Sequence, residues 1–400
     1  MDLNSIFFHI FDIMVHRIAA FRLAELASTF KAVAVTGPRQ TGKTTLVRTQ
    51  FPDKPYVSLE NPDTRRFALE DPRGFLNTYP KGAILDEVQR TPEIFSYLQE
   101  ILDRTPEPGS FILTGSNHFL LQQNISQSLA GRVAYLNLLP FSVEELAGAE
   151  WLPASDEEHM WKGGYPPIYD QRIPPQDWCA NYVRTYVERD VRQIRNISDL
   201  LVFDRFLRLV AGRSGQELNL TSLSVEAGVD VKTAQSWIGV LEGSFIIHLL
   251  PPYFHNFNKT IVKRPKLYML DTALLCHLIG VSDIGQLQTH PLRGAIFETM
   301  VVSELVKWRT HRGLAPQLYY WRDKTGHEID IIAQHHGSPV PMEIKAGQTI
   351  TSDYFKNLRY WMQKSGVAKG WVLYAGVSGQ QRSDGMGVLP WKEGLSLLDG

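Results

Sequence analysis

Residues 32–45 read AVAVTGPRQTGKTT, a short apolar run followed by a loop that contains two glycines. The loop fits the pattern G-x-x-x-x-G-K-[ST], in which backbone N–H groups cradle the phosphates of a nucleotide. In this pattern Lys43 reaches the β- and γ-phosphates, and the Thr44 hydroxyl binds Mg²⁺. A helix starting at Lys43 also turns its positive dipole end toward the anion. We therefore expect the nucleotide to contact the whole loop, namely Gly37, Pro38, Arg39, Gln40, Thr41, Gly42, Lys43, Thr44 and Thr45.

The loop lies within a β-then-α alternation that extends from about residue 31 to residue 145. Residues 1–30 read as an amphipathic helix that leads into the first strand. Strand-length apolar runs alternate with helical stretches, which predicts an α/β fold with a parallel sheet and helices on both faces. This context disfavours a chance match of the glycine pattern. The expected strands are Ala32–Thr36, Pro55–Leu59, Gly82–Asp86, Ser110–Thr114 and Val133–Leu138.

Two acids end the third of these strands, in the run Ile84-Leu85-Asp86-Glu87. Behind a phosphate loop, an Asp in this place holds Mg²⁺ directly or through water. The neighbouring Glu can polarise the attacking water as a general base. The alternative is a surface turn with two solvated carboxylates. We expect Asp86 to be a metal ligand and Glu87 to be catalytic.

Two further polar residues are candidates for catalysis. Asn117 follows the strand that ends near Gly115, where it could orient the attacking water or simply form a turn. Arg132 is a candidate for stabilising charge on the transferred phosphoryl group, either within its own chain or across a subunit interface. An ordinary surface arginine is the alternative for Arg132.

These motifs resemble those of the AAA-type P-loop ATPases of bacteria and archaea. The residues that carry the resemblance are Gly37–Thr44, Ile84–Glu87, Thr114–Asn117 and Leu129–Ser142. Close members of this group carry a winged-helix segment and a restriction-endonuclease-like C-terminal domain, so the resemblance extends over nearly the whole chain. It implies ATP rather than GTP as the nucleotide, because a guanine-reading N-K-x-D motif has no counterpart at a matching position. It also implies that a ring or dimer interface supplies the arginine.

The middle of the chain reads as a helix-turn-helix over residues 220–228 and 231–241. Such a unit can place its second helix on DNA. A hairpin-like segment over residues 257–268 would form the wing, and its cations could contact phosphates. These cations are Lys259, Lys263, Arg264 and Lys266. The alternative is a lid or packing platform beside the ATPase core, and the single basic residue of the second helix, Lys232, leaves both open.

A second group of charged residues lies in the C-terminal part of the chain. Residues two apart in a strand face the same side, so a hairpin turning at residues 335–338 would bring Asp330, Glu343 and Lys345 together. Their carboxylates suit Mg²⁺ or Mn²⁺, and the lysine can help to deprotonate a water. With Glu298 on a helix upstream, the set resembles the D…E-x-K site of restriction-endonuclease-like nucleases. The alternatives are a hairpin with solvated charges and a domain that binds DNA without cutting it.

Composition excludes several classes of protein. The 400 residues carry 41 basic and 42 acidic side chains, a formal charge of −1, which excludes a uniformly basic nucleic-acid binder. Cys179 and Cys276 are far apart and outside any metal-binding pattern, so we expect reduced, buried thiols and a cytoplasmic protein. We expect no membrane contact, because apolar runs of about 18 residues are lacking.

These observations predict a P-loop ATPase domain over residues 1–147, a helical and winged-helix segment over 148–284, and a nuclease-like α/β domain over 285–400. We expect ATP- and Mg²⁺-dependent hydrolysis that is coupled to DNA binding or to metal-dependent DNA cleavage. The alternative is a nucleotide-driven switch that binds a protein partner, with the C-terminal domain as a non-cleaving scaffold. Self-association through the ATPase domain is a further expectation. A small-molecule kinase is a third alternative, which the paired Asp86-Glu87 and the long C-terminal extension disfavour.

Overall fold

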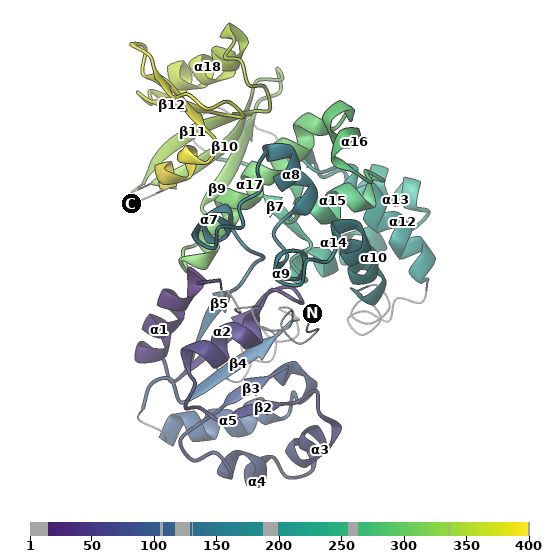
Figure 1. Ribbon diagram of the computed structural model, residues 1–400, viewed down its shortest axis with the longest axis vertical. Coiled ribbons are helices and arrows are strands. Elements are labelled where there is room, and N and C mark those ends of the chain that lie inside the picture. The colour runs from purple at the N-terminus through teal and green to yellow at the C-terminus, as the bar shows by residue number, and fades with distance from the viewer. Residues whose placement is uncertain are drawn as a thin grey trace, which may run out of the picture.

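The computed structural model describes residues 15–104, 107–116, 129, 131–186, 199–254, 263–335 and 337–398. Figure 1 shows two lobes joined by a narrow connection. The lower lobe holds the first sheet and its helices, and the upper lobe holds the remaining helices and two further sheets.

The first sheet is parallel throughout and has the strand order β2-β3-β4-β1-β5. Its five strands fall within the predicted runs or one residue beyond, so the predicted parallel α/β sheet is confirmed. Parallel pairing sets Thr36, at the end of β1, beside Gly115 and Asn137 of its two neighbours. The strands are β1 (Ala32–Thr36), β2 (Tyr56–Ser58), β3 (Ile84–Asp86), β4 (Phe111–Gly115) and β5 (Val133–Asn137).

Helices cover both faces of this sheet, because successive residues of each strand face opposite sides. In β1, Val33 and Val35 pack with Leu23 and Leu46 on one face, while Ala32 and Ala34 belong to the apolar cluster on the other face. The first face carries α1 (Ala19–Thr29) and α2 (Lys43–Gln50). The second face carries α3 (Pro62–Glu70), α4 (Pro72–Asn77) and α5 (Ile94–Arg104), with a 3₁₀ turn, η2 (Val88–Arg90), after β3.

The middle of the chain is helical and includes a three-stranded antiparallel sheet of order β6-β8-β7. The predicted helix-turn-helix is present as α13 and α14, and Gly228 in its turn has a φ of +76°. Residues 187–198 and 255–262 lie outside the described residues, and the second range includes Lys259 of the predicted wing. The elements are α7 (Val143–Gly148), α8 (Asp156–Lys162), α9 (Pro166–Tyr169), α10 (Pro175–Thr185), α12 (Leu200–Ala211), β6 (Gln216–Glu217), α13 (Leu220–Ala227), α14 (Val231–Gly243), β7 (Ile247–Leu250), β8 (Lys266–Met269), α15 (Thr272–Leu278) and α16 (Ile284–Thr289).

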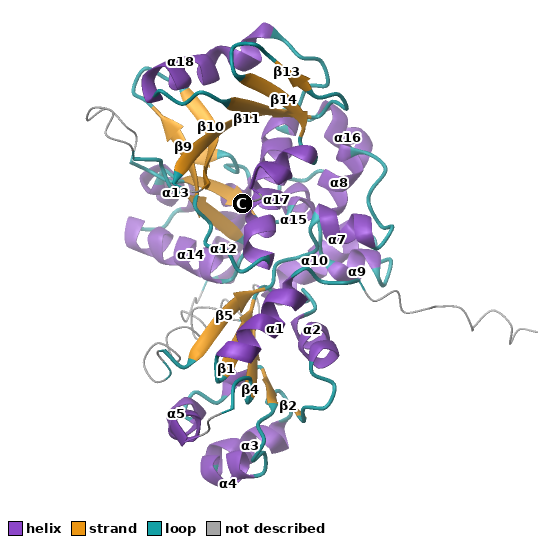
Figure 2. Ribbon diagram, turned by 90° about the vertical axis from the view of Figure 1, so that its left-hand side faces the viewer, coloured by secondary structure: helices purple, strands orange, loops and turns teal. Residues whose placement is uncertain are grey.

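The C-terminal part is a six-stranded mixed sheet of order β13-β14-β12-β11-β10-β9. Strands β9, β10 and β11 form an antiparallel meander, while β11, β12 and β14 run parallel. Figure 2 shows α18 over the outer side of this sheet and α17 on the side of the middle helices. The elements are α17 (Arg293–His311), β9 (Leu318–Arg322), β10 (Glu328–His335), β11 (Ser338–Lys345), η4 (Ser352–Phe355), α18 (Lys356–Ser365), β12 (Gly370–Tyr374), β13 (Gln380–Gln381), β14 (Met386–Pro390) and η5 (Glu393–Leu398).

One apolar cluster joins the middle helices to the C-terminal sheet. It runs from Leu139 through Phe206 and Trp237 to Phe297 on α17, and ends at Leu398. Helix α17 is buried along most of its length, as expected of a helix enclosed by other elements. The upper lobe is therefore one packed body across the predicted boundary at residues 284 and 285, which stays a prediction.

The two cysteines are buried thiols, as the sequence predicts. Cys179 and Cys276 are free and buried, and burial raises the pKa of the Cys276 thiol to about 12. Such thiols are unreactive because little thiolate forms. Among the described residues, every helix falls short of the length and apolarity that crossing a bilayer would require.

Two buried histidines make the stability of the fold depend on pH. Burial lowers the pKa of His159 to about 3 and that of His311 to about 4, so both are neutral in the folded protein. In the unfolded chain a histidine takes up a proton below about pH 6.5. Below that pH the unfolded state binds more protons, so the free energy of unfolding falls as the pH drops toward 4.

We predict that His311→Gln flattens this pH dependence. Wild-type protein should lose about 2 kcal/mol of unfolding free energy through His311 alone between pH 7 and pH 5, and the variant should not. Urea unfolding at both pH values measures the difference, with the half-buried His290→Gln as control. An equal loss in wild type and His311→Gln would show that His311 is not held neutral.

Candidate functional site

The predicted phosphate loop follows β1, which lies between β4 and β5 in the sheet, and α2 begins at Lys43 as predicted. Gly37 has a φ of +150°, and a Cβ atom there would lie 2.1 Å from the carbonyl oxygen of Leu138. Gly42 has a φ of +85° and caps α2 in the left-handed conformation. Both glycines of the pattern are therefore required by the path of the backbone.

Lys43 lies beneath the loop and is 6% exposed. Its ammonium donates to the carbonyl oxygens of Gly37 at 3.0 Å and Pro38 at 2.7 Å. The Thr41 hydroxyl donates to the same Pro38 oxygen at 3.0 Å. Of the other loop residues, Thr45 is exposed at the start of α2, Arg39 is half-buried, and the Gln40 side chain accepts a hydrogen bond from the indole of Trp178 on α10.

Thr44 and Asp86 meet at the end of β3. The Thr44 hydroxyl donates to Asp86 Oδ1 at 3.1 Å, and Thr114 donates to the same oxygen. Tyr56 donates to Asp86 Oδ2 at 2.7 Å; burial, followed by the Asp86 carboxylate, raises the pKa of Tyr56 to about 12, so its hydroxyl stays protonated. Three donors thus orient a carboxylate that is 7% exposed. A hydroxyl and a carboxylate in contact fit Mg²⁺, which is held by few protein ligands together with phosphate oxygens.

Glu87 has a φ of +56°, which turns the chain sharply after β3. Its Oε2 accepts hydrogen bonds from Gln89 Nε2 at 2.6 Å and from Ser116 Oγ, at the end of β4, at 3.2 Å. Asn117, the predicted orienting residue, lies outside the described residues. Tyr56, Thr114, Gln89 and Ser116 were not predicted as site residues. Thr114 and Ser116 lie at the end of β4, and this position in the sequence could have pointed to them.

Arg132 lies away from the phosphate loop. It directly precedes β5, beside Ala32 at the start of β1, whereas the loop follows the other end of β1. Four strand residues separate the two ends, a distance of roughly 13 Å. Arg132 Nε and Nη2 donate to Asp103 at 2.5 and 3.0 Å. The prediction that Arg132 acts on the nucleotide of its own chain is therefore wrong. Its action across a subunit interface stays a prediction.

A cavity of about 480 Å³ adjoins the phosphate loop. The loop and α2 contribute Gly42, Thr45 and Leu46 to its wall, and the segment before α1 contributes His16 and Arg17. The opposite wall comes from Phe141, Trp151, Pro166 and Asp170. Mostly apolar walls with a few polar groups are typical of small-molecule sites, and this volume lies in their usual range.

The predicted C-terminal hairpin brings Asp330, Glu343 and Lys345 together. Strands β10 and β11 pair with Ile331 opposite Met342, so Asp330 and Glu343 flank this pair on the same side. The Lys345 ammonium contacts Glu343 Oε2 and lies 3.6 Å from Asp330 Oδ2. Burial, followed by the Asp330 charge, raises the pKa of Glu343. Glu343 is 2% exposed, and its Oε1 has no hydrogen-bond partner within the described part of the chain.

Glu298, on α17, joins this cluster through Lys266 and Tyr268 of β8. The Lys266 ammonium lies 3.2 Å from Glu298 Oε1 and also contacts Glu328, while Tyr268 donates to Glu298 at 2.6 Å. The prediction that Lys266 is a wing cation free to contact phosphates is wrong, because it is 3% exposed and neutralises two carboxylates. Over the described ranges, no group of three or more His, Cys, Asp or Glu residues is arranged to hold a metal ion.

Comparison with known proteins identifies the parts of the chain. Family models match three successive segments: an AAA domain over residues 29–147, and domains of unknown function, DUF8612 and DUF4143, over residues 155–284 and 293–393. The uncharacterized protein Rv2008c of Mycobacterium tuberculosis is 31% identical over 381 residues, which cover 94% of this chain and 83% of the relative. The chain belongs to the family of this mycobacterial protein. The same values hold for Mb2031c of Mycobacterium bovis.

Two solved structures match parts of this chain at low sequence identity. The Walker-type ATPase PABY2304 of Pyrococcus abyssi is 15% identical and has a TM-score of 0.45, covering 65% of this chain and 94% of the ATPase. RuvB of Thermotoga maritima is 18% identical with a TM-score of 0.28, covering 58% of this chain and 87% of RuvB. With the AAA family model, the parallel sheet and the glycine loop identify residues 29–147 as an AAA-type P-loop ATPase domain.

We predict that Lys266→Met destabilises the protein by about 1–3 kcal/mol, because the half-buried Glu298 carboxylate loses its lysine, whereas Glu328 keeps Arg322 at 3.4 Å. The loss should be smaller at pH 5 than at pH 8, because burial raises the pKa of Glu298 and its protonation removes the uncompensated charge. Urea unfolding at both pH values measures it. Lys364→Met, at an exposed lysine on α18, is the control. A variant as stable as wild type at pH 8 would show that the Lys266 pairs contribute nothing.

Proposed function

We propose that the protein binds ATP along residues 37–45 and hydrolyses it with Mg²⁺. The observation that carries this proposal is the contact between Thr44 and Asp86, 3.1 Å apart at the strand ends behind a glycine loop. The loop, the first helix turn and the acidic strand end all belong to the domain matched by the AAA family model. Mg²⁺, when bound, would neutralise negative charge on the phosphates.

Each residue of the site has a role in this proposal. Lys43 donates to the phosphate oxygens in place of the Gly37 and Pro38 carbonyls. Thr44 and Asp86 offer their oxygens to the metal, and Tyr56 and Thr114 keep the Asp86 carboxylate oriented. Glu87 polarises the attacking water, and its contacts with Gln89 and Ser116 support this role by fixing the carboxylate at the end of β4.

We also assign the nucleoside to the cavity of about 480 Å³ beside the loop. Its wall includes Gly42 and Thr45, so a molecule with phosphates on the loop would direct its base into this space. The rings of Phe141 and Trp151, 6.3 Å apart, offer apolar surface to a flat base. Arg132 then serves in this proposal only across an interface between copies of the ATPase domain.

Two substitutions separate nucleotide binding from hydrolysis. Lys43→Ala should weaken ATP binding at least about 100-fold, because the loss of a charged donor leaves the phosphates uncompensated. Glu87→Gln should leave the ATP affinity near that of wild type and lower kcat by roughly 10²–10⁴-fold. Binding of a fluorescent ATP analogue and release of inorganic phosphate measure the two effects. Lys81→Ala, at an exposed lysine of the same domain, is the matched control.

An unchanged ATP affinity in Lys43→Ala would refute the assignment of the loop. Hydrolysis that proceeds without an added acceptor would separate this proposal from a small-molecule kinase. If Glu87→Gln hydrolyses ATP at the wild-type rate, the general base is another residue.

For the upper lobe we propose that nucleotide state is coupled to DNA. The order α12, β6, α13, α14, β7 and β8, with its three-stranded sheet, supports a winged helix. Lys263 and Arg264 are exposed at the base of the hairpin. The convergence of Asp330, Glu343 and Lys345 on one hairpin supports a nuclease-like domain, and the free Oε1 of Glu343 is an oxygen that a Mg²⁺ ion could use.

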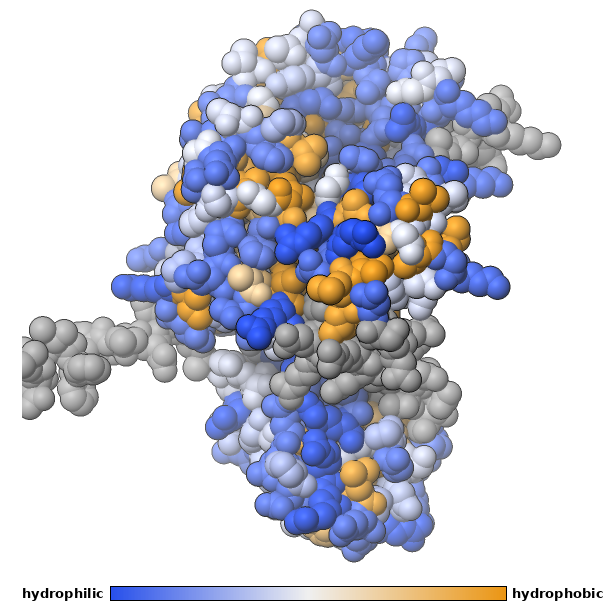
Figure 3. All heavy atoms as spheres, turned by 90° about the vertical axis from the view of Figure 1, so that its right-hand side faces the viewer, coloured by the Kyte–Doolittle hydropathy of each residue, from blue (hydrophilic) through white to orange (hydrophobic). Residues whose placement is uncertain are grey.

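A protein-binding switch is the second candidate, and two observations favour it. Large apolar side chains are exposed on the helix-turn-helix region, namely Leu201, Val225 and Val231. Figure 3 shows apolar residues gathered over the middle of the face on the right of Figure 1. Lysines also neutralise the C-terminal carboxylates, as in a scaffold that does not cleave. DNA binding requires a basic surface, whereas a protein partner would cover an apolar one.

Titration with duplex DNA at several salt concentrations distinguishes these candidates. If DNA is bound, the logarithm of affinity should fall linearly with the logarithm of salt concentration, and Asp330→Ala should abolish any Mg²⁺-dependent cleavage. Fluorescence anisotropy and a gel-based cleavage assay measure both effects. Absence of DNA binding at low salt would favour the switch, and undiminished cleavage by Asp330→Ala would place the nuclease site elsewhere.

A further inference from the structure

A buried arginine connects the phosphate loop to the upper lobe. Arg17 directly precedes α1 and is 7% exposed. Its Nη1 donates to the carbonyl oxygen of Thr41 in the loop at 2.6 Å, and its Nη2 donates to the carbonyl oxygen of Leu139 at 2.7 Å. Its Nε donates to Glu145 Oε1 at 2.9 Å. One planar guanidinium therefore holds three acceptors, an arrangement that the single ammonium of a lysine cannot reproduce.

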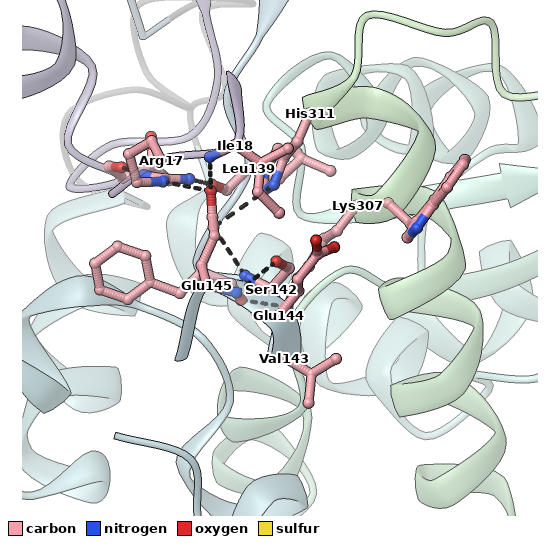
Figure 4. Close-up of polar contacts among 12 residues, drawn as sticks. Arg17, Ile18, Leu139, Ser142, Val143, Glu144, Glu145, Lys307 and His311 are labelled. Atoms are coloured by element: carbon pink, nitrogen blue, oxygen red, sulfur yellow. Dashed lines mark hydrogen bonds and ion pairs between the residues drawn. The ribbon is translucent and has the colours of Figure 1, made fainter. Parts of the chain in front are cut away.

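Glu145 is the centre of this connection (Figure 4). Besides Arg17, it accepts the Ile18 N–H at 2.9 Å and the Ser142 N–H at 3.0 Å, which closes the capping box of α7. Burial alone raises the pKa of Glu145, but the Arg17 guanidinium lowers it to about 2. The carboxylate is therefore ionised, and both of its oxygens accept hydrogen bonds. A substitution that removes its charge weakens several contacts together.

Helix α17 contacts residues 141–145 from the side opposite Arg17. His311 Nδ1 lies 3.6 Å from Glu145 Oε2. Glu304 accepts the Val143 N–H at 2.7 Å, and Lys307 donates to the Phe141 carbonyl at 3.0 Å and to Glu304 at 2.7 Å. Figure 4 shows Glu145 between Arg17 and this helix, with His311 and Lys307 on the side of the helix.

The same helix carries Glu298 of the C-terminal carboxylate cluster. Thirteen residues separate Glu298 from His311, which corresponds to about 20 Å along the helix axis. A displacement at one end of a buried helix therefore moves the other end, because a packed helix shifts as a unit.

Nucleotide binding must disturb the loop end of this connection. Lys43 donates to the Pro38 carbonyl, and the Thr41 hydroxyl donates to the same oxygen. When Lys43 turns to the phosphates, the Pro38 carbonyl loses one of these two donors. The change is adjacent to Thr41, whose own carbonyl is held by Arg17.

We propose that Arg17 is a positioning residue that holds the phosphate loop through Thr41 and, with Glu145, passes the change on nucleotide binding to α17. This inference rests on the proposed ATP binding and identifies the route by which the nucleotide reaches the upper lobe. The route runs from Pro38 and Thr41 through Arg17 and Glu145 to the start of α7, which α17 holds through Glu304 and Lys307.

The test compares hydrogen–deuterium exchange of residues 293–311 in full-length protein with and without a non-hydrolysable ATP analogue. In wild type we expect the analogue to change the exchange of α17. Arg17→Lys should keep the charge and the fold, bind ATP about tenfold more weakly, and lose the nucleotide-dependent change in α17 at saturating analogue. Glu145→Gln should lose the same change. Arg312→Lys is the matched control, since Arg312 pairs with the exposed Glu144 at the rim of the same joint.

The outcomes are distinct. If wild type binds the analogue and α17 exchange does not respond, or if Arg17→Lys responds like wild type, the route through Arg17 is wrong. Failure of wild type to bind any adenine nucleotide would instead refute the proposed function. The route is supported if α17 of Arg17→Lys exchanges at the same rate with and without the analogue, while α17 of wild type responds to the analogue. Circular dichroism and the melting temperature show whether the loss of the response comes instead from unfolding of the variant.

Discussion

The parallel pairing of β1, β3 and β4 is the constraint on which the ATPase site depends. Parallel strands end at the same edge of a sheet, so the residues that follow each strand are neighbours in space although far apart in sequence. The edge collects the glycine loop after β1, Asp86 and Glu87 at the end of β3, and Thr114 and Ser116 at the end of β4. The Thr44–Asp86 contact is a direct result of this register.

Buried charges organise the rest of the molecule. In the upper lobe, Lys266 and Lys345 neutralise carboxylates from β10, β11 and α17, and at the joint between the lobes Arg17 neutralises Glu145. Buried pairs of this kind contribute little net stability, but the removal of one partner is costly. They therefore act by specifying which elements meet, which suits positions where segments from different parts of the chain must be held in one arrangement.

Much of the fold and part of the site could be predicted because their patterns are local. Alternating apolar runs gave the five strands of the first sheet, and the spacing within residues 37–44 gave the loop and the start of α2. Partners from other segments could not be predicted, because nothing near Tyr56, Trp178 or Arg17 in the sequence specifies what they contact. Lys266 was expected at the surface because lysines rarely lose their water, and its burial depends on carboxylates far along the chain.

The apolar cluster from Leu139 to Leu398 has a consequence for how this protein can be divided. A fragment beginning near residue 285 would uncover the side of α17 that packs on the middle helices, and an isolated middle fragment would uncover the opposite side of that contact. Either piece alone would expose apolar surface to water, so the middle helices and the C-terminal sheet behave as a single unit of folding.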